Sequence, residues 1–97
     1  MTFEEFRQSI STDTAPPAGL SALLQALWHD ARGNWDRAHQ LAQDVETKDG
    51  AWVHAYLHRK EGDASNAGYW YRRASQVMFT GSLDEEWTEI AEALLQR

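Results

Sequence analysis

Residues 51–75, AWVHAYLHRKEGDASNAGYWYRRAS, decide how the chain folds. The segment WVHAYLHRK has its apolar residues spaced as on one face of a helix, and ASNAGYWYRRA repeats that spacing around small alanines. Gly62 followed by Asp63 separates the two segments. Such a pair is typical of a helix that ends at a glycine and a next helix that begins at a capping carboxylate. The stretch therefore predicts a helix, a tight turn and a second helix.

A second copy of this pattern lies upstream. Trp28–Asn34 aligns with Leu57–Asp63, so that Gly33 stands 29 residues before Gly62, and alanines recur at matching positions around each glycine. One amphipathic hairpin alone would leave its apolar face in water. The internal repeat therefore predicts two helical hairpins that stack side by side.

Helices are also expected at the two ends of the chain. Thr2 with Glu5 is a capping-box pattern that opens a short helix over 2–10, and the proline-rich stretch before residue 20 favours an extended linker. Ser82 with Glu85 is a second capping box, which opens a last helix that runs to about residue 96.

Together these patterns predict a single all-α domain over residues 1–97, with about five helices arranged as a stack of antiparallel hairpins. The expected parts are an N-terminal helix and linker in 1–19, a first hairpin in 20–47, a second hairpin in 48–79 and a C-terminal capping helix in 80–97. Within the stack, helical segments are expected near 19–32, 35–46, 51–60, 64–78 and 82–96.

Composition and charge argue against several classes of function. The chain has no cysteine, so it has no disulfide, thiolate metal site or cysteine nucleophile, and this suits a reducing compartment such as the cytoplasm. Fifteen acidic against nine basic residues give a net charge of −6, which disfavours nucleic acid and anionic membranes as partners. The apolar runs are far too short for a membrane span, and MTFEEFRQSI lacks the apolar region of a secretory signal.

Small residues and a glycine recur at fixed positions in both hairpins. In the second hairpin they are Ala55, Gly62-Asp63, Ala67, Tyr71 and Ala74, and in the first they are Ala26, Gly33-Asn34-Trp35 and Ala38. These positions resemble those of the tetratricopeptide repeat, with Ala55 in its first helix and Gly62-Asp63, Ala67, Tyr71 and Ala74 in its turn and second helix. The segment Ala67–Ala74 is also similar to the second helix of a Sel1-like repeat, although the longer glycine-bearing turn of that family is missing.

Two features depart from the tetratricopeptide pattern. The spacing of 29 residues is shorter than the usual period of 34. Polar side chains stand where the family usually has apolar or aromatic ones in its first helix, namely Gln25, His29, His54 and His58. The hairpins are therefore expected to pack at an unusual rotation.

The resemblance implies a protein-interaction scaffold and not an enzyme, and we expect no cofactor. Residue matching places the usual peptide groove of the family on Leu23, Leu27, Trp52, Tyr56 and Arg59. Aromatic side chains in a groove are plausible anchors for a protein or peptide partner. The same residues form the best core stripe of this chain, so the sequence leaves open whether they line a groove or a core. A homodimer that uses this apolar face is a third possibility.

The histidines suggest an alternative function. His54 and His58 are four residues apart, so both imidazoles can face one side of a helix and bind a metal ion. His29 occupies the repeat position equivalent to His58, and Asp30 or His39 is a possible further ligand. The alternative is thus a metal-binding protein or metal-dependent hydrolase centred on His29, His54 and His58. The competing interpretation is a pair of partly buried, hydrogen-bonded histidines between hairpins.

No segment has the pattern of a catalytic motif. The chain lacks GxSxG, a phosphate loop, a dinucleotide fingerprint and HExxH, so we expect a protein that is not an enzyme. Tyr69–Arg73 has the composition of a nucleic-acid stacking platform, but Trp70 and Tyr71 belong largely to the packing stripe. The basic residues around the Gly62 turn either hold a carboxylate of a partner or are solvated helix ends.

Overall fold

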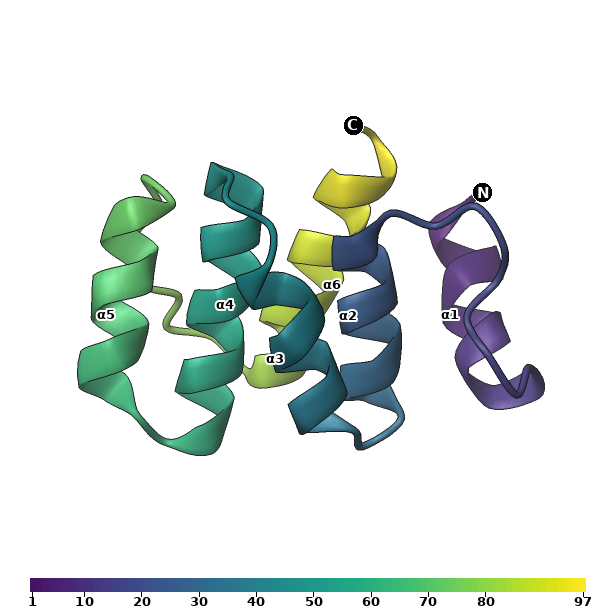
Figure 1. The fold of residues 1–97 in the computed structure, drawn as a ribbon, viewed down its shortest axis with the longest axis horizontal. Helices are drawn as coiled ribbons and strands as arrows, with labels where there is room; N and C mark the ends of the chain where they lie inside the picture. The colour runs from purple at the N-terminus through teal and green to yellow at the C-terminus, as the bar shows by residue number, and fades with distance from the viewer.

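The computed structural model describes residues 1–97 and is helical apart from its connections (Figure 1). Its six helices are α1 Phe3–Thr12, α2 Ala22–Ala31, α3 Trp35–Gln43, α4 Lys48–Glu61, α5 Ala64–Arg73 and α6 Leu83–Leu95. The predicted all-α class is confirmed, and the number of helices is close to the expected one. None of these helices combines the length and apolarity that a membrane crossing requires.

Two glycines reverse the chain within the hairpins. Gly33 has φ 82° between α2 and α3, and Gly62 has φ 91° between α4 and α5. This left-handed region suits glycine because it has no Cβ. The residues that follow, Asn34 and Asp63, each accept a hydrogen bond from the backbone N–H three residues further on. The predicted reversals at both glycines are confirmed.

The start of α4 differs from the expected one. The sequence pattern places it at about residue 51, whereas α4 begins at Lys48. Thr47 is the N-cap, because its Oγ1 accepts a hydrogen bond from the backbone N–H of Gly50 at 3.0 Å. A capping hydroxyl of this kind satisfies a backbone donor that the first turn of a helix otherwise leaves unpaired.

The end of α5 also differs from the expected one. The helix ends at Arg73, before the predicted limit near Met78. Ser75 adopts the left-handed conformation with φ 58°, and the backbone N–H of Gln76 donates to the carbonyl of Tyr71 at 3.0 Å. This hydrogen-bond pattern closes the last turn of a helix. Residues 76–81 then connect α5 to α6 without regular structure.

The helices form two hairpins with a shared covering helix (Figure 1). The most extensive contacts lie within the α2–α3 and α4–α5 pairs, and α3 joins the two hairpins because it also packs on α4. Helix α6 packs across both α2 and α4, and Figure 1 shows it behind them with α3 in front. Helix α1 docks at the edge of the molecule, where Phe6 stacks on Trp87 of α6 with ring centroids 5.8 Å apart.

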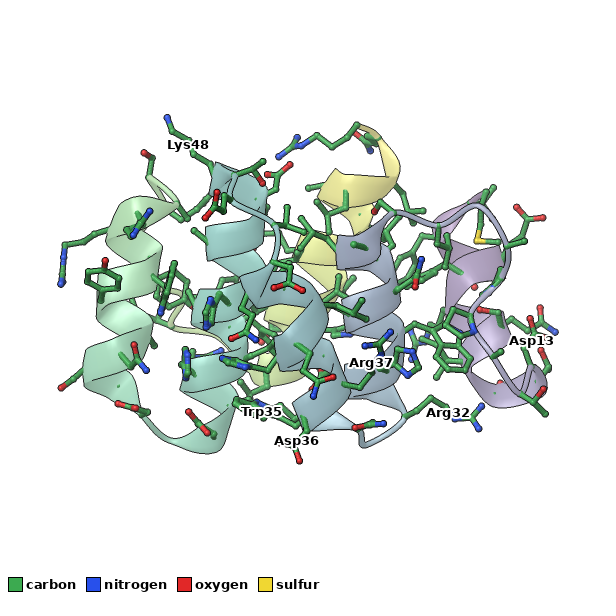
Figure 2. All side chains as sticks on the ribbon, viewed as in Figure 1. Asp13, Arg32, Trp35, Asp36, Arg37 and Lys48 are labelled. Carbon is green, nitrogen blue, oxygen red and sulfur yellow. The ribbon has the colours of Figure 1, made fainter.

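Direct hydrogen bonds fix the N-terminal segment to the first hairpin. Arg32, at the end of α2, donates to the carbonyl oxygens of Ile10 at 2.9 Å and Asp13 at 2.6 Å (Figure 2). The indole of Trp28 donates to Ser9 at 3.1 Å. These bonds, together with the aromatic stack on α6, hold α1 in place although few other residues cover it.

Candidate functional site

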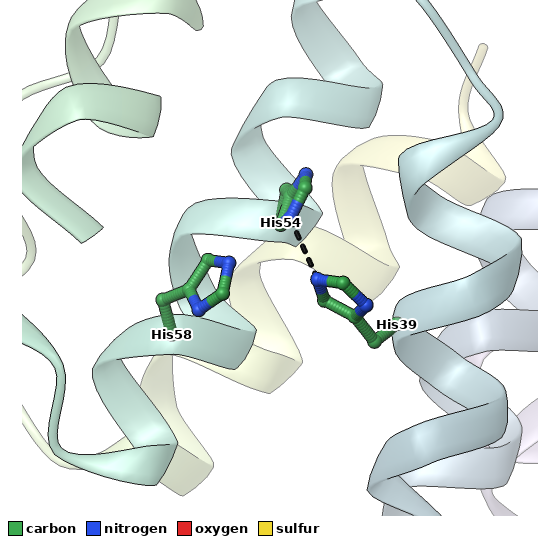
Figure 3. A group of neighbouring side chains, drawn as sticks. All are labelled: His39, His54 and His58. Carbon is green, nitrogen blue, oxygen red and sulfur yellow. Dashed lines mark hydrogen bonds between the residues drawn. The ribbon is translucent and has the colours of Figure 1, made fainter. Parts of the chain in front are cut away.

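Three histidine side chains meet between the two hairpins (Figure 3). His39 comes from α3, and His54 and His58 come from α4. One ring nitrogen of each residue lies within 4.8 Å of a ring nitrogen of the other two. The Nε2 atoms of His39 and His54 are 2.9 Å apart. We refer to these three residues as the histidine cluster, and it connects the first hairpin to the second.

Helix geometry and one indole hydrogen bond position the cluster. The four-residue spacing on α4 stacks the rings of His54 and His58, with centroids 4.7 Å apart. Trp35 anchors the first turn of α3 to α4, because its indole N–H donates to the carbonyl of Leu57 at 2.8 Å. The same indole stacks on His39 with centroids 4.9 Å apart, so the anchored turn also orients the third imidazole.

A carboxylate outside the cluster orients one of its rings. Glu61 Oε1 lies 2.6 Å from Nδ1 of His58. A proton on Nδ1 that is donated to this carboxylate leaves a lone pair on Nε2. Figure 3 shows the Nε2 side of the His58 ring facing His39 and His54. The same carboxylate–histidine arrangement supports metal-ligating histidines in general.

Burial lowers the pKa of two histidines of the cluster. His54 is 6 % exposed and His58 is 7 % exposed, while His39 is half-buried. The pKa of His54 is lowered to about 4, mainly by burial and to a smaller extent by the neighbouring His39 and His58. Burial is also the main cause that lowers the pKa of His39, followed by His58. Neutral imidazoles offer the lone pairs that a metal ion needs.

Helix α5 supplies an aromatic wall beside the cluster. Trp70 stacks on His54 with ring centroids 4.0 Å apart. The guanidinium of Arg73 lies 5.2 Å from the centroid of the same indole, and it donates a hydrogen bond to the hydroxyl of Tyr69 at 3.0 Å. The guanidinium of Arg73 also lies 5.8 Å from the centroid of the Tyr69 ring, and the indole of Trp70 covers one face of the His54 imidazole.

The donor set of the cluster suits a transition metal ion. Nitrogen ligands about 2.0 Å from a tetrahedral zinc ion lie about 3.3 Å from one another. The His39–His54 separation of 2.9 Å and the 4.8 Å limit of the whole cluster bracket that distance. Small side-chain rotations therefore bring the three nitrogens to ligating positions. Without such an ion, the His39–His54 contact is a hydrogen bond between one protonated and one unprotonated nitrogen.

His29 does not belong to the cluster. It lies half-buried on α2, where its ring contacts Trp28 edge-on with centroids 5.3 Å apart. The repeat suggested that His29 would lie near His58. However, α3 packs against both α2 and α4, so it is α3 that supplies the third imidazole through His39. Asp30, the other possible ligand, is engaged elsewhere.

The residues matched to a peptide groove lie in the core. Leu23, Leu27, Trp52 and Tyr56 are all buried in the same core as the apolar face of α6. The covering helix is fixed there by Trp87, whose indole N–H donates to the carbonyl of Leu27 at 3.0 Å. These four side chains are therefore not accessible to a peptide or to a second copy of the chain. Of the two arrangements that the sequence left open, the core is the one found.

Two basic residues at the end of α4, Arg59 and Lys60, are engaged within the chain. Arg59, the fifth residue matched to the groove, pairs with Glu86 of α6 at 3.0 Å. Lys60 pairs with Asp30 of α2 at 2.9 Å. Neither side chain is left to hold a carboxylate of a partner. These ion pairs instead tie the end of α4 to the neighbouring helices.

The sequence patterns did not predict the burial of two carboxylates, of which only Asp30 had been named, as a possible metal ligand. Asp30 is 2 % exposed and accepts hydrogen bonds from Tyr56 and Lys60, and Glu86 is fully buried beside Arg59 and Tyr71. Burial raises the pKa of Glu86. Glu86 lies four residues before the inward-facing Ile90 and therefore on the same face of α6. This spacing was the feature of the sequence that could have indicated its burial.

A wide cleft of about 1170 Å³ opens between α1 and α6. The ends of α2 and α4 form its floor, with Asp30, Tyr56 and Lys60 among the lining residues. Acidic side chains predominate on its walls, namely Glu4, Asp84, Glu85, Glu89 and Glu92. Arg7 is the basic residue of the walls. Of the residues that the sequence assigned to a peptide groove, only Tyr56 lines this cleft.

Comparison with known proteins identifies no relative: no family model, no curated protein and no solved structure matches this chain.

Proposed function

We propose that the protein binds a divalent transition metal ion through His39, His54 and His58. The observation that supports this most is the convergence of three imidazoles from two helices on one point between the hairpins. Burying several imidazoles together is costly, because each protonated ring repels the others and each neutral ring needs a hydrogen-bond partner. A metal ion satisfies the three lone pairs at once.

The donor atoms favour zinc, copper or nickel over magnesium or calcium. Imidazole nitrogen suits the former ions, whereas magnesium and calcium require mostly oxygen ligands. The chain has no cysteine to supply a softer thiolate. Zinc is the natural first choice for the test, because it is redox-inert and accepts a tetrahedral set of nitrogens.

The role proposed for the ion is binding rather than hydrolysis. A hydrolytic site needs a general base beside the metal-bound water. The carboxylate in contact with the cluster, Glu61, is hydrogen-bonded to His58 and supports the ligand instead. Because His39 belongs to the first hairpin and the other two ligands to the second, a bound ion would also cross-link the two hairpins and stabilise the fold.

Isothermal titration of the purified protein with zinc after treatment with a chelator tests this proposal. We expect one ion per chain, and a roughly 100-fold or greater loss of affinity in each of the His39→Gln, His54→Gln and His58→Gln variants. His29→Gln is the matched control, because it removes a half-buried histidine outside the cluster. Absence of saturable binding, or an equal loss in His29→Gln, would contradict the proposal.

A second candidate function is the binding of a protein or peptide, now at the cleft between α1 and α6. Four carboxylates of its walls, Glu4, Asp84, Glu89 and Glu92, take part in none of the ion pairs of the structure. Their charges favour a lysine- or arginine-rich segment as the occupant. This candidate keeps the interaction role implied by the tetratricopeptide resemblance but moves it to another surface.

Fluorescence anisotropy with a labelled hexalysine peptide tests the second candidate. Binding should weaken severalfold in a Glu89→Gln, Glu92→Gln double variant and should weaken with added salt. An Asp44→Asn, Glu46→Gln double variant is the control, since these exposed residues lie outside the cleft and remove the same charge. Equal weakening by both double variants would show only a general attraction to an acidic protein.

A further inference from the structure

We infer that the metal ion held by the histidine cluster keeps one coordination position for an exogenous oxyanion, such as a small carboxylate or phosphate group. This inference rests on the proposed metal binding and adds the class of ligand that the bound ion would take. It is supported by the number of protein ligands, by the charge of the site and by a cavity that is lined by one of the ligands, His54.

The protein supplies only three ligands to the site. The cluster comprises His39, His54 and His58, and no carboxylate shares their 4.8 Å grouping. Glu61 approaches His58 through Nδ1, on the ring edge that does not face the cluster. Structural zinc sites are closed by four protein ligands, whereas sites with three protein ligands bind water or another small ligand in the fourth position. The count of ligands therefore predicts an exchangeable position.

The charge of the site favours an anion in that position. Three neutral imidazoles leave the two positive charges of the ion uncompensated, and two of the three ligands are almost fully buried. A buried charge is costly unless a charge of opposite sign accompanies it. Glu61 contributes one negative charge beyond His58. An oxyanion on the ion would supply the second and complete the neutralisation.

A cavity beside His54 provides space for such a ligand. Its volume is about 330 Å³, which is at the lower end of the range for small-molecule sites. His54 and Trp70 form part of its wall, so the cavity reaches the cluster at His54, whereas His39 and His58 do not line it. Lys48 and Arg73 also line it and give it two positive charges against the single carboxylate of Glu46. The lining therefore has the charge that an oxyanion prefers.

The alternative is a site that the protein closes by itself. The side-chain nitrogen of Asn66 lies 3.4 Å from Nε2 of His58, and rotation of the amide would turn its oxygen to the same side. An ion that takes this oxygen as its fourth ligand would have no position for an exogenous group. The experiment must therefore separate an open site from one closed by Asn66.

Cobalt(II) serves as the probe, because its visible absorption bands report the number and kind of its ligands. Calorimetry with cobalt chloride alone first measures metal binding. The cobalt-loaded protein is then titrated with acetate or methyl phosphate at constant ionic strength. We expect a saturable 1:1 change in the visible bands. We also expect a roughly tenfold weaker oxyanion affinity in a Lys48→Gln, Arg73→Gln double variant, with unchanged cobalt affinity. Arg72→Gln is the control, because Arg72 is exposed and does not line the cavity.

The two steps separate the two failures. If cobalt does not bind, the proposed metal binding fails and this inference fails with it. If cobalt binds but neither oxyanion changes its spectrum, the metal proposal stands and the inference is overturned. A response that appears only in Asn66→Ala also overturns it, because the native site would then be closed. Equal weakening by Arg72→Gln and the double variant would overturn the assignment of the oxyanion to this cavity.

Discussion

The molecule buries polar side chains in two regions, and these side chains have different kinds of partner in each region. On the α6 side of α4, each buried carboxylate has a cation and a tyrosine hydroxyl: Asp30 contacts Lys60 and Tyr56, and Glu86 contacts Arg59 and Tyr71. On the α3 side of α4, three histidines face one another instead. The first region is neutralised by ion pairs within the chain, whereas the second consists of imidazole nitrogens that are hydrogen-bonded to one another, to Glu61 and to Asn66.

This difference separates a structural role from a binding role. A buried ion pair with hydrogen-bonded neighbours is complete, and breaking it should cost stability without affecting any ligand. The three imidazoles have hydrogen-bond partners but differ from such a pair, because protonation of one ring disfavours protonation of its neighbours. The predictions that follow test whether stability depends mainly on the first region and metal binding only on the second.

The largest effect on stability is expected for Glu86→Ala. The substitution leaves Arg59 and Tyr71 without their common partner in a buried position, and such a loss typically costs about 3 kcal/mol of unfolding free energy. Urea denaturation followed by circular dichroism measures it. Glu89→Ala, on the exposed face of the same helix, should change the unfolding free energy by less than about 0.5 kcal/mol. Similar losses in both variants would show that α6 responds to any substitution.

The next largest effect is a loss of stability of the metal-free protein between pH 7 and pH 5. The pKa of His54 is lowered to about 4 in the fold, whereas an unfolded histidine has a pKa near 6.5, so the unfolded chain binds a proton that the folded chain does not. This contribution to stability is complete above pH 6.5 and is lost as the pH falls toward 4. At pH 5, linkage gives a loss of at most about 2 kcal/mol.

Urea denaturation in the presence of a chelator at both pH values measures this loss. The groups that face His54 are His39 and His58, with Glu61 beyond them, and they remain in a His54→Gln variant. The difference in unfolding free energy between pH 7 and pH 5 should therefore be smaller in that variant than in the native protein. Equal differences would place the pH sensitivity outside the cluster.

A smaller effect is expected for Tyr56→Phe. The hydroxyl donates to the buried carboxylate of Asp30 at 2.8 Å, and its removal leaves Lys60 as the remaining side-chain partner. Loss of one hydrogen bond to a buried charged group should cost roughly 1 to 2 kcal/mol. Tyr69→Phe removes a hydroxyl of the exposed Tyr69 and should cost under about 0.5 kcal/mol. Thermal unfolding of the native protein and of the Tyr56→Phe and Tyr69→Phe variants under the same conditions measures both losses of stability.

The smallest effect on stability is expected for His39→Gln without metal. His39 is half-buried and has no partner of opposite charge, so its replacement should change the unfolding free energy by less than about 1 kcal/mol. With zinc at 100 times its dissociation constant, the native protein should gain about 2.7 kcal/mol, and the variant should gain almost none. Differential scanning calorimetry with and without zinc checks both statements. A large decrease in the unfolding free energy of the metal-free variant would show that His39 stabilises the fold by itself and would contradict a binding role.

The local sequence determined the helices and their reversals. Gly33 and Gly62 turn the chain where the patterns placed them, and the capping boxes at Thr2 and Ser82 open α1 and α6 as expected. These features depend on residues within one or two turns of each other, so periodicity and capping chemistry are sufficient to predict them. The end of α5 is an exception, since the helix stops before the predicted limit, where Ser75 adopts the left-handed conformation. The sequence did not indicate this turn, because the residue that forms it is not a glycine.

The tertiary structure alone decided which surfaces are available and which histidines meet. The apolar stripe of α2 and α4 has the same sequence pattern whether a peptide or another helix covers it. Only the docking of α6, which is held by Trp87, shows that the stripe belongs to the core. The choice of His39 over His29 likewise depends on α3 packing against α4. Contacts between residues far apart in the chain depend on which helix fills the space, and a pattern within one helix does not specify its neighbour.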